Sequence, residues 1–201
     1  MTDGVVHIID DDEALRDSLA FLLDSARMPC ALYPSARDFL ERLPGLANGC
    51  VLTDVRMPDM NGLELVRRLN TVGYRDPIVV MTGHADVPLA VEAMKEGVHD
   101  FIEKPFDDEL MLNALDSALR RRAADRIEDD QIAELDRRLD LLSGREREVL
   151  EGLIAGSANK VIAFDLGISP RTVEIYRAHV MSKMQAASLS QLVRMVMTVR
   201  R

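Results

Sequence analysis

Five short apolar runs, separated by longer segments with helical spacing, constrain the fold of this chain more than any other feature of its sequence. The runs are VVHII (5–9), CALY (30–33), CVLT (50–53), IVVMT (78–82) and FIE (101–103). Strands rich in valine and isoleucine that alternate with helices are typical of a parallel sheet covered on both faces. We therefore predict a doubly wound α/β domain with a five-stranded parallel sheet. Its functional crevice should lie beyond the carboxyl ends of the strands.

Length and composition limit the remaining possibilities. The 201 residues, 47% of them hydrophobic, allow one large globular domain or two small ones. No apolar run approaches the roughly 20 residues of a membrane span, and the N-terminus lacks a basic region followed by an apolar stretch. We therefore expect a cytoplasmic protein with no membrane partner. Cys30 and Cys50 should be buried, reduced thiols rather than a disulfide or metal ligands.

Charge is distributed unevenly along the chain, whose net charge is −9. Residues 1–122 carry 13 Lys and Arg against 22 Asp and Glu, residues 123–142 carry 3 against 7, and residues 143–201 carry 9 against 5. An acidic first part and a basic last part indicate two domains with different partners. A basic module in an acidic chain favours nucleic acid as one of them.

The segment 123–142 has the pattern of a helical linker. It contains no Pro or Gly, and Ile127, Leu135, Leu139 and Leu142 form a sparse apolar stripe within dense charge. The stripe leaves two interpretations open, a solvated helix or a helix that pairs in a dimer.

A second domain is expected from Ser143 onward. Ser143 and Glu146 have the spacing of a capping box ahead of a helix that ends at Gly156. A short helix at 159–166 and a Gly-containing turn follow, and Ser169-Pro170 is a strong helix start. Two helices joined by such a turn make a helix-turn-helix. With a helix over 170–184 and a last one over 188–199, we predict an all-α domain of four helices.

Polar residues follow the ends of the predicted strands. Asp10 and Asp11 follow the first strand and Asp54 ends the third, so the three carboxylates should converge at one edge of the sheet. Two carboxylates about 5 Å apart repel by about 3 kcal/mol at an effective dielectric constant of about 20. An all-oxygen site half open to water suits Mg²⁺. Thr82 and Lys104 end the fourth and fifth strands at the same edge, and the whole set suits phosphoryl transfer.

These motifs resemble a known family. IIDDDE (8–13), TDVRMPDMNG (53–62), MTGH (81–84) and FIEKPF (101–106) resemble the receiver domain of bacterial two-component response regulators. GHADVPLAVEAMKEGVHDFIEKPF and SPRTVE narrow the resemblance to the FixJ-like subgroup of the NarL/LuxR-type regulators. The resemblance covers nearly the whole chain, and the linker is its weakest part.

The resemblance implies roles for the residues of the acidic edge. Asp54 would accept the phosphoryl group. Asp11 would bind Mg²⁺ directly and Asp10 mostly through water, and the backbone carbonyl of Arg56 would complete the protein ligands.

A second group of residues would respond to phosphorylation. Lys104 would pair with the phosphoryl oxygens, Thr82 would hydrogen-bond the phosphoryl group, and Phe101 occupies the aromatic switch position, which is compatible with simple core packing. Val91 and Lys95 are the best candidates for a receiver dimer contact. The Lys104-Pro105 bond is expected to be cis.

The helix from Pro170 would enter the major groove of DNA. By resemblance, Glu174, Ile175 and Ala178 fall where base-facing residues sit. Phosphate or other DNA contacts are expected from Asn159, Lys160, Arg171, Thr172, Arg177, His179 and Lys183. Many relatives have Lys where Glu174 stands, so their base preference does not transfer to this chain.

The last helix offers more apolar surface than a small core needs. We expect Leu192, Val193 and Val196 to supply part of a homodimer contact that presents two recognition helices to paired half-sites. Core packing alone is the alternative.

The sequence therefore predicts a transcription regulator, not an enzyme, that a histidine kinase phosphorylates and that dimerises and binds promoter DNA. RNA polymerase is a further expected partner. Three alternatives stay open: a phosphate relay with a vestigial DNA domain, a phosphorylation-independent DNA-binding protein and, more distantly, a metal hydrolase. His7, His84 and His99 are expected to be packing or loop residues.

Overall fold

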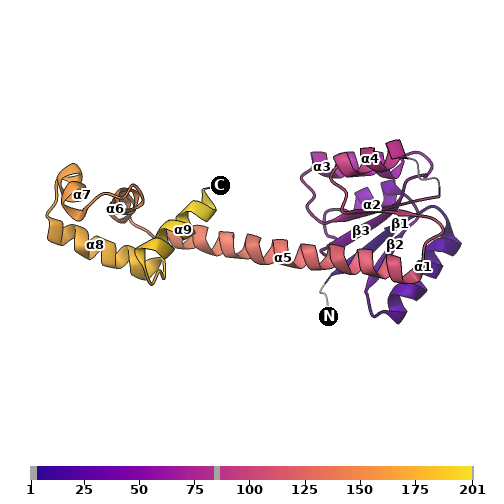
Figure 1. The fold of residues 1–201 in the computed structure, drawn as a ribbon, viewed down its shortest axis with the longest axis horizontal. Helices are drawn as coiled ribbons and strands as arrows, with labels where there is room; N and C mark the ends of the chain where they lie inside the picture. Colours follow the sequence, from indigo (N-terminus) through magenta and orange to yellow (C-terminus); the bar gives the residue numbers. More distant parts are fainter. Residues whose placement is uncertain (1–3, 84–86, 201) are drawn as a thin grey trace. The chain divides into compact units, whose positions relative to one another are not determined.

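The computed structural model describes residues 4–83 and 87–200. The chain divides into two compact units, residues 1–125 and 126–201, and each is described separately below. Figure 1 labels the helices and strands of both units. Within the described residues, no helix combines the length and the apolar character needed to cross a bilayer.

The first unit contains the five-stranded parallel sheet that the apolar runs predict. Its strands are β1 (Val5–Ile9), β2 (Cys30–Tyr33), β3 (Gly49–Asp54), β4 (Ile78–Thr82) and β5 (Asp100–Glu103). They pair in the order β2-β1-β3-β4-β5, and every pairing is parallel. The connection from β2 to β3 crosses over β1, so the strand order changes direction between β1 and β3. A doubly wound sheet places its functional crevice at such a switch point.

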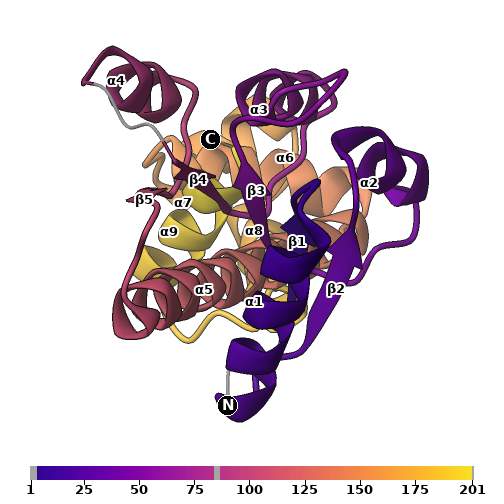
Figure 2. The same cartoon turned by 90° about the vertical axis from the view of Figure 1, so that its right-hand side faces the viewer.

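Helices cover both faces of this sheet. They are α1 (Glu13–Ser25), α2 (Ala36–Arg42), α3 (Gly62–Thr71), α4 (Val87–Lys95) and α5 (Asp108–Asp140), which continues into the second unit. Figure 2 shows α1 and α5 on one face and α2, α3 and α4 on the other. Successive strand residues point to opposite faces, so Ile8 and Leu52 pack toward α1 and α5 whereas Ile9 and Val51 pack toward the other helices. The predicted two-layered covering is confirmed.

The second unit contains the four predicted helices after the end of α5. They are α6 (Gly144–Ile154), α7 (Asn159–Leu166), α8 (Pro170–Lys183) and α9 (Leu189–Val199). Ser143 caps α6 in a complete capping box with Glu146, and the Ser169 side chain caps α8. Gly167 ends α7 in the left-handed conformation at φ 65°, which a residue without a Cβ adopts without strain. The helix-turn-helix is therefore formed by α7, this turn and α8.

The apolar stripe of 123–142 has a use that the sequence pattern left undecided. Leu142 is buried in the core of the second unit, and Leu139 packs against the same core. Ile127 is exposed. The end of α5 and the residues directly after it therefore contribute to the hydrophobic core of the second unit, which is neither a solvated helix nor a dimer contact.

The two cysteines and His7 have structural rather than metal-binding surroundings in the described residues. Both cysteines are free thiols, Cys50 is fully buried, and burial raises the pKa of its thiol to about 12. His7 is buried, with Nδ1 3.0 Å from the Tyr33 hydroxyl and Nε2 2.8 Å from the Ala47 carbonyl oxygen. Its predicted packing role is confirmed. His84 lies outside the described residues.

Candidate functional site

The carboxyl edge of the sheet brings three charged side chains into direct contact. Lys104, which follows β5, places Nζ 2.7 Å from Asp54 Oδ1 and 2.9 Å from Asp10 Oδ2. Asp10 and Asp54 are 1% and 5% exposed, and the Lys104 side chain is 22% exposed. Parallel strands end at the same edge, so residues 94 and 50 positions apart from Lys104 meet there.

A backbone hydrogen bond joins Lys104 to the end of β4. Its backbone N–H donates to the carbonyl oxygen of Thr82 at 2.7 Å, and Thr82 itself is fully buried. The Lys104-Pro105 peptide bond is cis, as predicted. The two neighbouring strand ends therefore fix the backbone from which the ammonium reaches the carboxylates.

Burial and hydrogen bonds shift the pKa values of two groups in this cluster. Desolvation raises the pKa of the Asp54 carboxyl, although hydrogen bonds from Lys104 act against it, and the nearby Asp10 raises it further. Burial alone would lower the pKa of Lys104, but its hydrogen bonds to Asp54 and Asp10 outweigh that effect and raise it. Asp11 adds a third carboxylate at this edge, so the negative charges outnumber the single ammonium.

The turn after β3 closes tightly over Asp54. Its Oδ2 accepts a hydrogen bond from the Arg56 N–H at 2.6 Å, and Asn61 caps α3 by accepting from the Glu64 N–H at 2.8 Å. A Cβ on Gly62 would lie 2.2 Å from the backbone oxygen of Asp54. Only glycine at position 62 lets the start of α3 approach the end of β3 so closely.

The residues of this edge suit a magnesium ion. Mg²⁺ takes oxygen ligands, needs only one or two carboxylates and keeps several waters. Asp10, Asp11 and Asp54 supply carboxylates, of which Asp11 is exposed to solvent. Arg56 follows Asp54 by two residues and lines the same cavity as Asp11. Within the described residues no group of three or more His, Cys, Asp or Glu side chains is placed to hold a metal ion by itself. A magnesium ion here would therefore need water and the Arg56 carbonyl oxygen in addition to these carboxylates.

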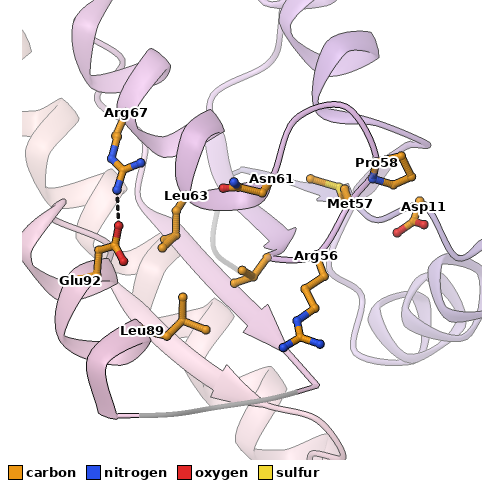
Figure 3. Close-up of a pocket in the computed structure, with 10 residues that line it drawn as sticks. Asp11, Arg56, Met57, Pro58, Asn61, Leu63, Arg67, Leu89 and Glu92 are labelled. Carbon is orange, nitrogen blue, oxygen red and sulfur yellow. Dashed lines mark hydrogen bonds and ion pairs between the residues drawn. The ribbon is translucent and has the colours of Figure 1, made fainter.

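A cavity of about 650 Å³ adjoins this edge. Asp11 and Arg56 line one end, and Leu63 of α3 and Leu89 of α4 line its middle (Figure 3). At the other end Arg67 pairs with Glu92 and, at 2.8 Å, with Glu96, which joins α3 to α4. Sequence reasoning missed this bridge, because the paired residues are 25 and 29 positions apart and follow no local motif.

The expected switch and dimer residues lie on the β4–β5 side of the same unit. Phe101 of β5 is partly buried and packs against the cluster that includes Ala93 of α4. Val91 and Lys95 are both exposed on α4. The structure thus leaves these two side chains accessible on a helix beside the cavity.

The second unit presents most of the expected DNA-facing residues on the surface. Exposed residues on α8 are Arg171, Glu174, Ile175, Ala178 and His179, whereas Thr172, Arg177 and Lys183 are partly buried. On α7, Lys160 is exposed and Asn159 is partly buried at the first turn, where no side chain caps the helix. Uncapped N–H groups at a helix start favour an anion such as a phosphate.

Lys183 has partners that the sequence did not predict. Its Nζ donates to Glu146 Oε2 at 2.6 Å and to the Leu141 carbonyl oxygen at 3.1 Å. His179 places Nδ1 3.5 Å from Glu146 Oε1. The capping-box motif identified Glu146, but no local signal connects it with a lysine 37 residues later.

The expected dimer contact on α9 needs a correction. Leu192 and Val196 are both fully buried in the core of the second unit, so they are not available to a partner without unfolding. Val193 is partly exposed and Met197 is 48% exposed. The most apolar side of α9 packs against the core of its own domain. Val193 and Met197, beside it, are the apolar residues that reach solvent.

Two family models match the chain in succession. Residues 6–116 match the response regulator receiver domain, and residues 140–196 match the bacterial regulatory proteins of the luxR family. The chain therefore belongs to the two-component response regulators that join a receiver domain to a LuxR-type DNA-binding domain. Regulators of this family control transcription, and activation by phosphorylation is their general mechanism.

Several similar proteins are transcriptional regulators named FixJ. The transcriptional regulatory protein FixJ of Azorhizobium caulinodans is 55% identical over 192 residues, which cover 96% of this chain and 91% of that protein. FixJ of Bradyrhizobium diazoefficiens is 53% identical over 196 residues, which cover 98% and 96%. Among solved structures, full-length FixJ from B. japonicum matches with a TM-score of 0.62 and 52% identity, covering 100% of this chain and 98% of that one. The response regulator StyR matches with a TM-score of 0.85 and 38% identity, covering 96% and 98%.

The comparisons also bear on partners. A receiver domain implies a histidine kinase as phosphoryl donor, and a LuxR-type domain implies DNA as ligand. Receiver domains generally bind Mg²⁺ at their acidic pocket. The predicted resemblance, fold and regulatory function are therefore confirmed at the level of the family.

Proposed function

We propose that Asp54 is the residue that accepts the phosphoryl group. One carboxylate oxygen forms the new bond to phosphorus as the bond between phosphorus and the histidine nitrogen of the kinase breaks. The single observation that carries this proposal is the contact of Lys104 Nζ with both Asp54 and Asp10 in a buried pocket at the strand ends. The ammonium is positioned to neutralise charge on the transferred group, and phosphoryl transfer depends mainly on positioning and neutralisation.

Asp10, Asp11 and the Arg56 carbonyl would hold Mg²⁺ beside Asp54. The bound ion would supply positive charge to the phosphoryl oxygens, in a pocket where carboxylates outnumber the lysine. Asp54 stays oriented by the Arg56 N–H, which donates to its Oδ2. This hydrogen bond supports a fixed orientation of the Asp54 carboxylate for attack on phosphorus.

Phosphorylation would then change the β4–β5 side of the receiver. A phosphoryl group adds nearly a second negative charge and several hydrogen-bond acceptors to the pocket. Thr82 and Phe101 are the proposed switch residues, because one ends β4 at the pocket and the other packs toward α4. Val91 and Lys95 on the exposed face of α4 are the proposed receiver dimer contact.

The DNA-binding domain would read DNA through α8. Glu174, Ile175 and Ala178 are the proposed base-facing residues; Glu accepts from cytosine N4, and Ile or Ala contacts a thymine methyl. Arg171, Thr172, Arg177 and His179 on α8, with Asn159 and Lys160 on α7, are the proposed backbone contacts. Residues 1–122, 123–142 and 143–201 are the proposed receiver, linker and DNA-binding segments. Val193 remains the proposed dimer contact on α9, and RNA polymerase a proposed partner.

Labelling tests the phosphoryl acceptor. The full chain is incubated with Mg²⁺ and radiolabelled acetyl phosphate, and the label retained on the protein is measured. We expect Asp54→Asn to lose the label. Asp59→Asn, a change of the same chemistry in the same turn, should keep it. Undiminished label on Asp54→Asn would refute the assignment.

A further inference from the structure

The C-terminal end of α8 is fastened to the rest of its domain by a polar cluster. Lys183, Glu146 and the Leu141 carbonyl meet within hydrogen-bonding distance, and His179 lies beside them. The Glu146 side chain is only 5% exposed, so protein groups rather than water satisfy its charge. The hydrogen bond from the Lys183 ammonium is the largest of these interactions.

Glu146 also holds the start of α6. Its Oε2 accepts from the Ser143 N–H at 2.7 Å, while the Ser143 hydroxyl oxygen accepts from the Glu146 N–H at 3.3 Å. The hydrogen bond from Lys183, and after it the one from the Ser143 N–H, lower the pKa of the Glu146 carboxyl to about 2. One carboxylate therefore joins the cap of α6 to the end of α8.

The end of α5 completes the attachment. The Arg138 guanidinium donates from Nη1 to the Met184 carbonyl oxygen at 3.3 Å, directly after the last residue of α8. Met184 and Leu142 are both buried in the same core. Three segments thus fix the position and rotation of α8 at the end where Lys183 stands.

The other basic residues of α8 are placed differently. Within the described part of the chain, no carboxylate forms an ion pair with Arg171 or Arg177, whereas the charge of Lys183 is already compensated. Lys183 follows Arg171 by 12 residues, which is about 18 Å along a helix axis. The first turns of a recognition helix are the ones that meet the bases. Charge and position both separate Lys183 from the proposed DNA-facing residues.

We propose that Lys183 and Glu146 are a positioning pair for the recognition helix, and that Lys183 does not bind a DNA phosphate. The pair fixes the angle at which α8 presents Arg171, Glu174 and Ile175. This inference rests on the proposed DNA-facing role of α8. It replaces the phosphate contact that the sequence predicted for Lys183.

A double-mutant cycle in the full chain tests the pair. Lys183→Met is made in the wild-type background and in the Glu146→Gln background, because glutamine at this position can still accept from the Ser143 N–H and keep the cap. Affinity is measured with beryllofluoride and Mg²⁺, over a series of salt concentrations. The probes are a DNA site that the wild-type chain selects from a random pool and a scrambled sequence. Circular dichroism checks that each variant is folded.

We expect Lys183→Met to weaken binding to the selected site about tenfold in the wild-type background and less than about twofold in the Glu146→Gln background. The ratio of selected-site to scrambled-site affinity should fall with it. A lysine whose role were only to stabilise the fold would leave that ratio unchanged in the folded variant. The slope of log affinity against log salt should stay the same, because no phosphate contact is lost.

Arg171→Gln is the matched control. Arg171→Gln should weaken DNA binding by the same factor in both backgrounds. The slope of log affinity against log salt should become shallower by about 0.9, the value for one phosphate contact. The same pattern for Lys183→Met would overturn the inference, and so would unchanged affinity in both backgrounds. If Arg171→Gln changed neither affinity nor slope, the DNA-facing role of α8 would fail, while the cycle would still decide whether Lys183 acts through Glu146.

Discussion

Two buried carboxylates, Asp54 in the receiver and Glu146 in the DNA-binding unit, each accept a hydrogen bond from a lysine, yet their pKa values shift in opposite directions. Burial raises the pKa of Asp54, and Asp10 adds to the effect. The Lys183 hydrogen bond lowers the pKa of Glu146 to about 2. Lys104 is shared between Asp10 and Asp54, whereas Lys183 serves one carboxylate, which a backbone N–H also binds.

The difference separates a reactive site from a structural one. A pocket that must receive a phosphoryl group holds two carboxylates close together, and a single lysine ammonium neutralises only part of their charge. A carboxylate that only fastens helices has its hydrogen-bonding capacity filled from within the domain. The same residue chemistry therefore destabilises one unit and stabilises the other at neutral pH. Four substitutions test this difference.

The largest effect is expected where the backbone itself forms the pocket. Gly62→Ala places a Cβ 2.2 Å from the backbone oxygen of Asp54. We expect a loss of about 3 kcal/mol in the free energy of unfolding of the receiver, because overpacking forces the backbone to shift. Hydrogen exchange of the β3 and α3 amides measures it. Gly83→Ala, where a Cβ meets nothing within 4 Å, should cost less than about 1 kcal/mol.

Glu146→Gln should destabilise the DNA-binding unit by about 2 kcal/mol at pH 7. Because folding lowers the pKa of this carboxyl, its contribution is complete above the ordinary value near 4.5 and is lost as the pH falls toward about 2. Hydrogen exchange of the α6 and α8 amides at neutral pH, and unfolding monitored down to pH 2, follow the difference. Glu148→Gln, on the exposed side of α6, is the control with little effect. A difference between wild type and Glu146→Gln that grows as the pH falls would have the wrong sign.

Asp54→Asn should stabilise the receiver by about 1 kcal/mol at pH 7 in the absence of divalent cations, as changes at functional sites often do. Folding raises the pKa of Asp54, so the folded state is penalised as the pH rises through the folded pKa, and the gain from asparagine disappears in acid. Urea unfolding with EDTA at several pH values measures it. A receiver that is less stable as Asp54→Asn would contradict the contrast with Glu146.

The smallest effect is expected at the bridge between α3 and α4. The Arg67 side chain is 46% exposed, although it pairs with Glu92 and Glu96. Water screens such pairs, so Arg67→Gln should cost less than about 1 kcal/mol. Urea unfolding of the receiver checks this value. A loss above about 2 kcal/mol would show that exposed pairs matter here as much as the buried ones.

The fold and the acidic pocket could be predicted because local patterns encode them. Apolar runs indicated the strands, and parallel topology then required Asp10, Asp54, Thr82 and Lys104 to share one edge. The capping box and Ser169-Pro170 set the starts of α6 and α8 in the same way. In each case the information lies within a few residues, or follows from the topology of the sheet.

The contacts between distant helices could not be read in this way. Lys183 looked like a phosphate ligand because it is basic and lies on the recognition helix, but its partners lie at the start of α6 and after α5. Leu192 and Val196 looked available because helical periodicity shows which side of α9 is apolar, not what covers it. In the structure that apolar side is buried in the core of the second unit, to which Leu142 also contributes.

A DNA-binding experiment shows whether chemistry at Asp54 controls the other unit. The affinity of the full chain for its selected DNA site is compared with and without beryllofluoride and Mg²⁺, for wild type and for Asp54→Asn. We expect beryllofluoride to tighten DNA binding by the wild type at least about tenfold, or about 1.4 kcal/mol, and to leave the affinity of Asp54→Asn unchanged. An equal response of both proteins, or of neither, would contradict this expectation.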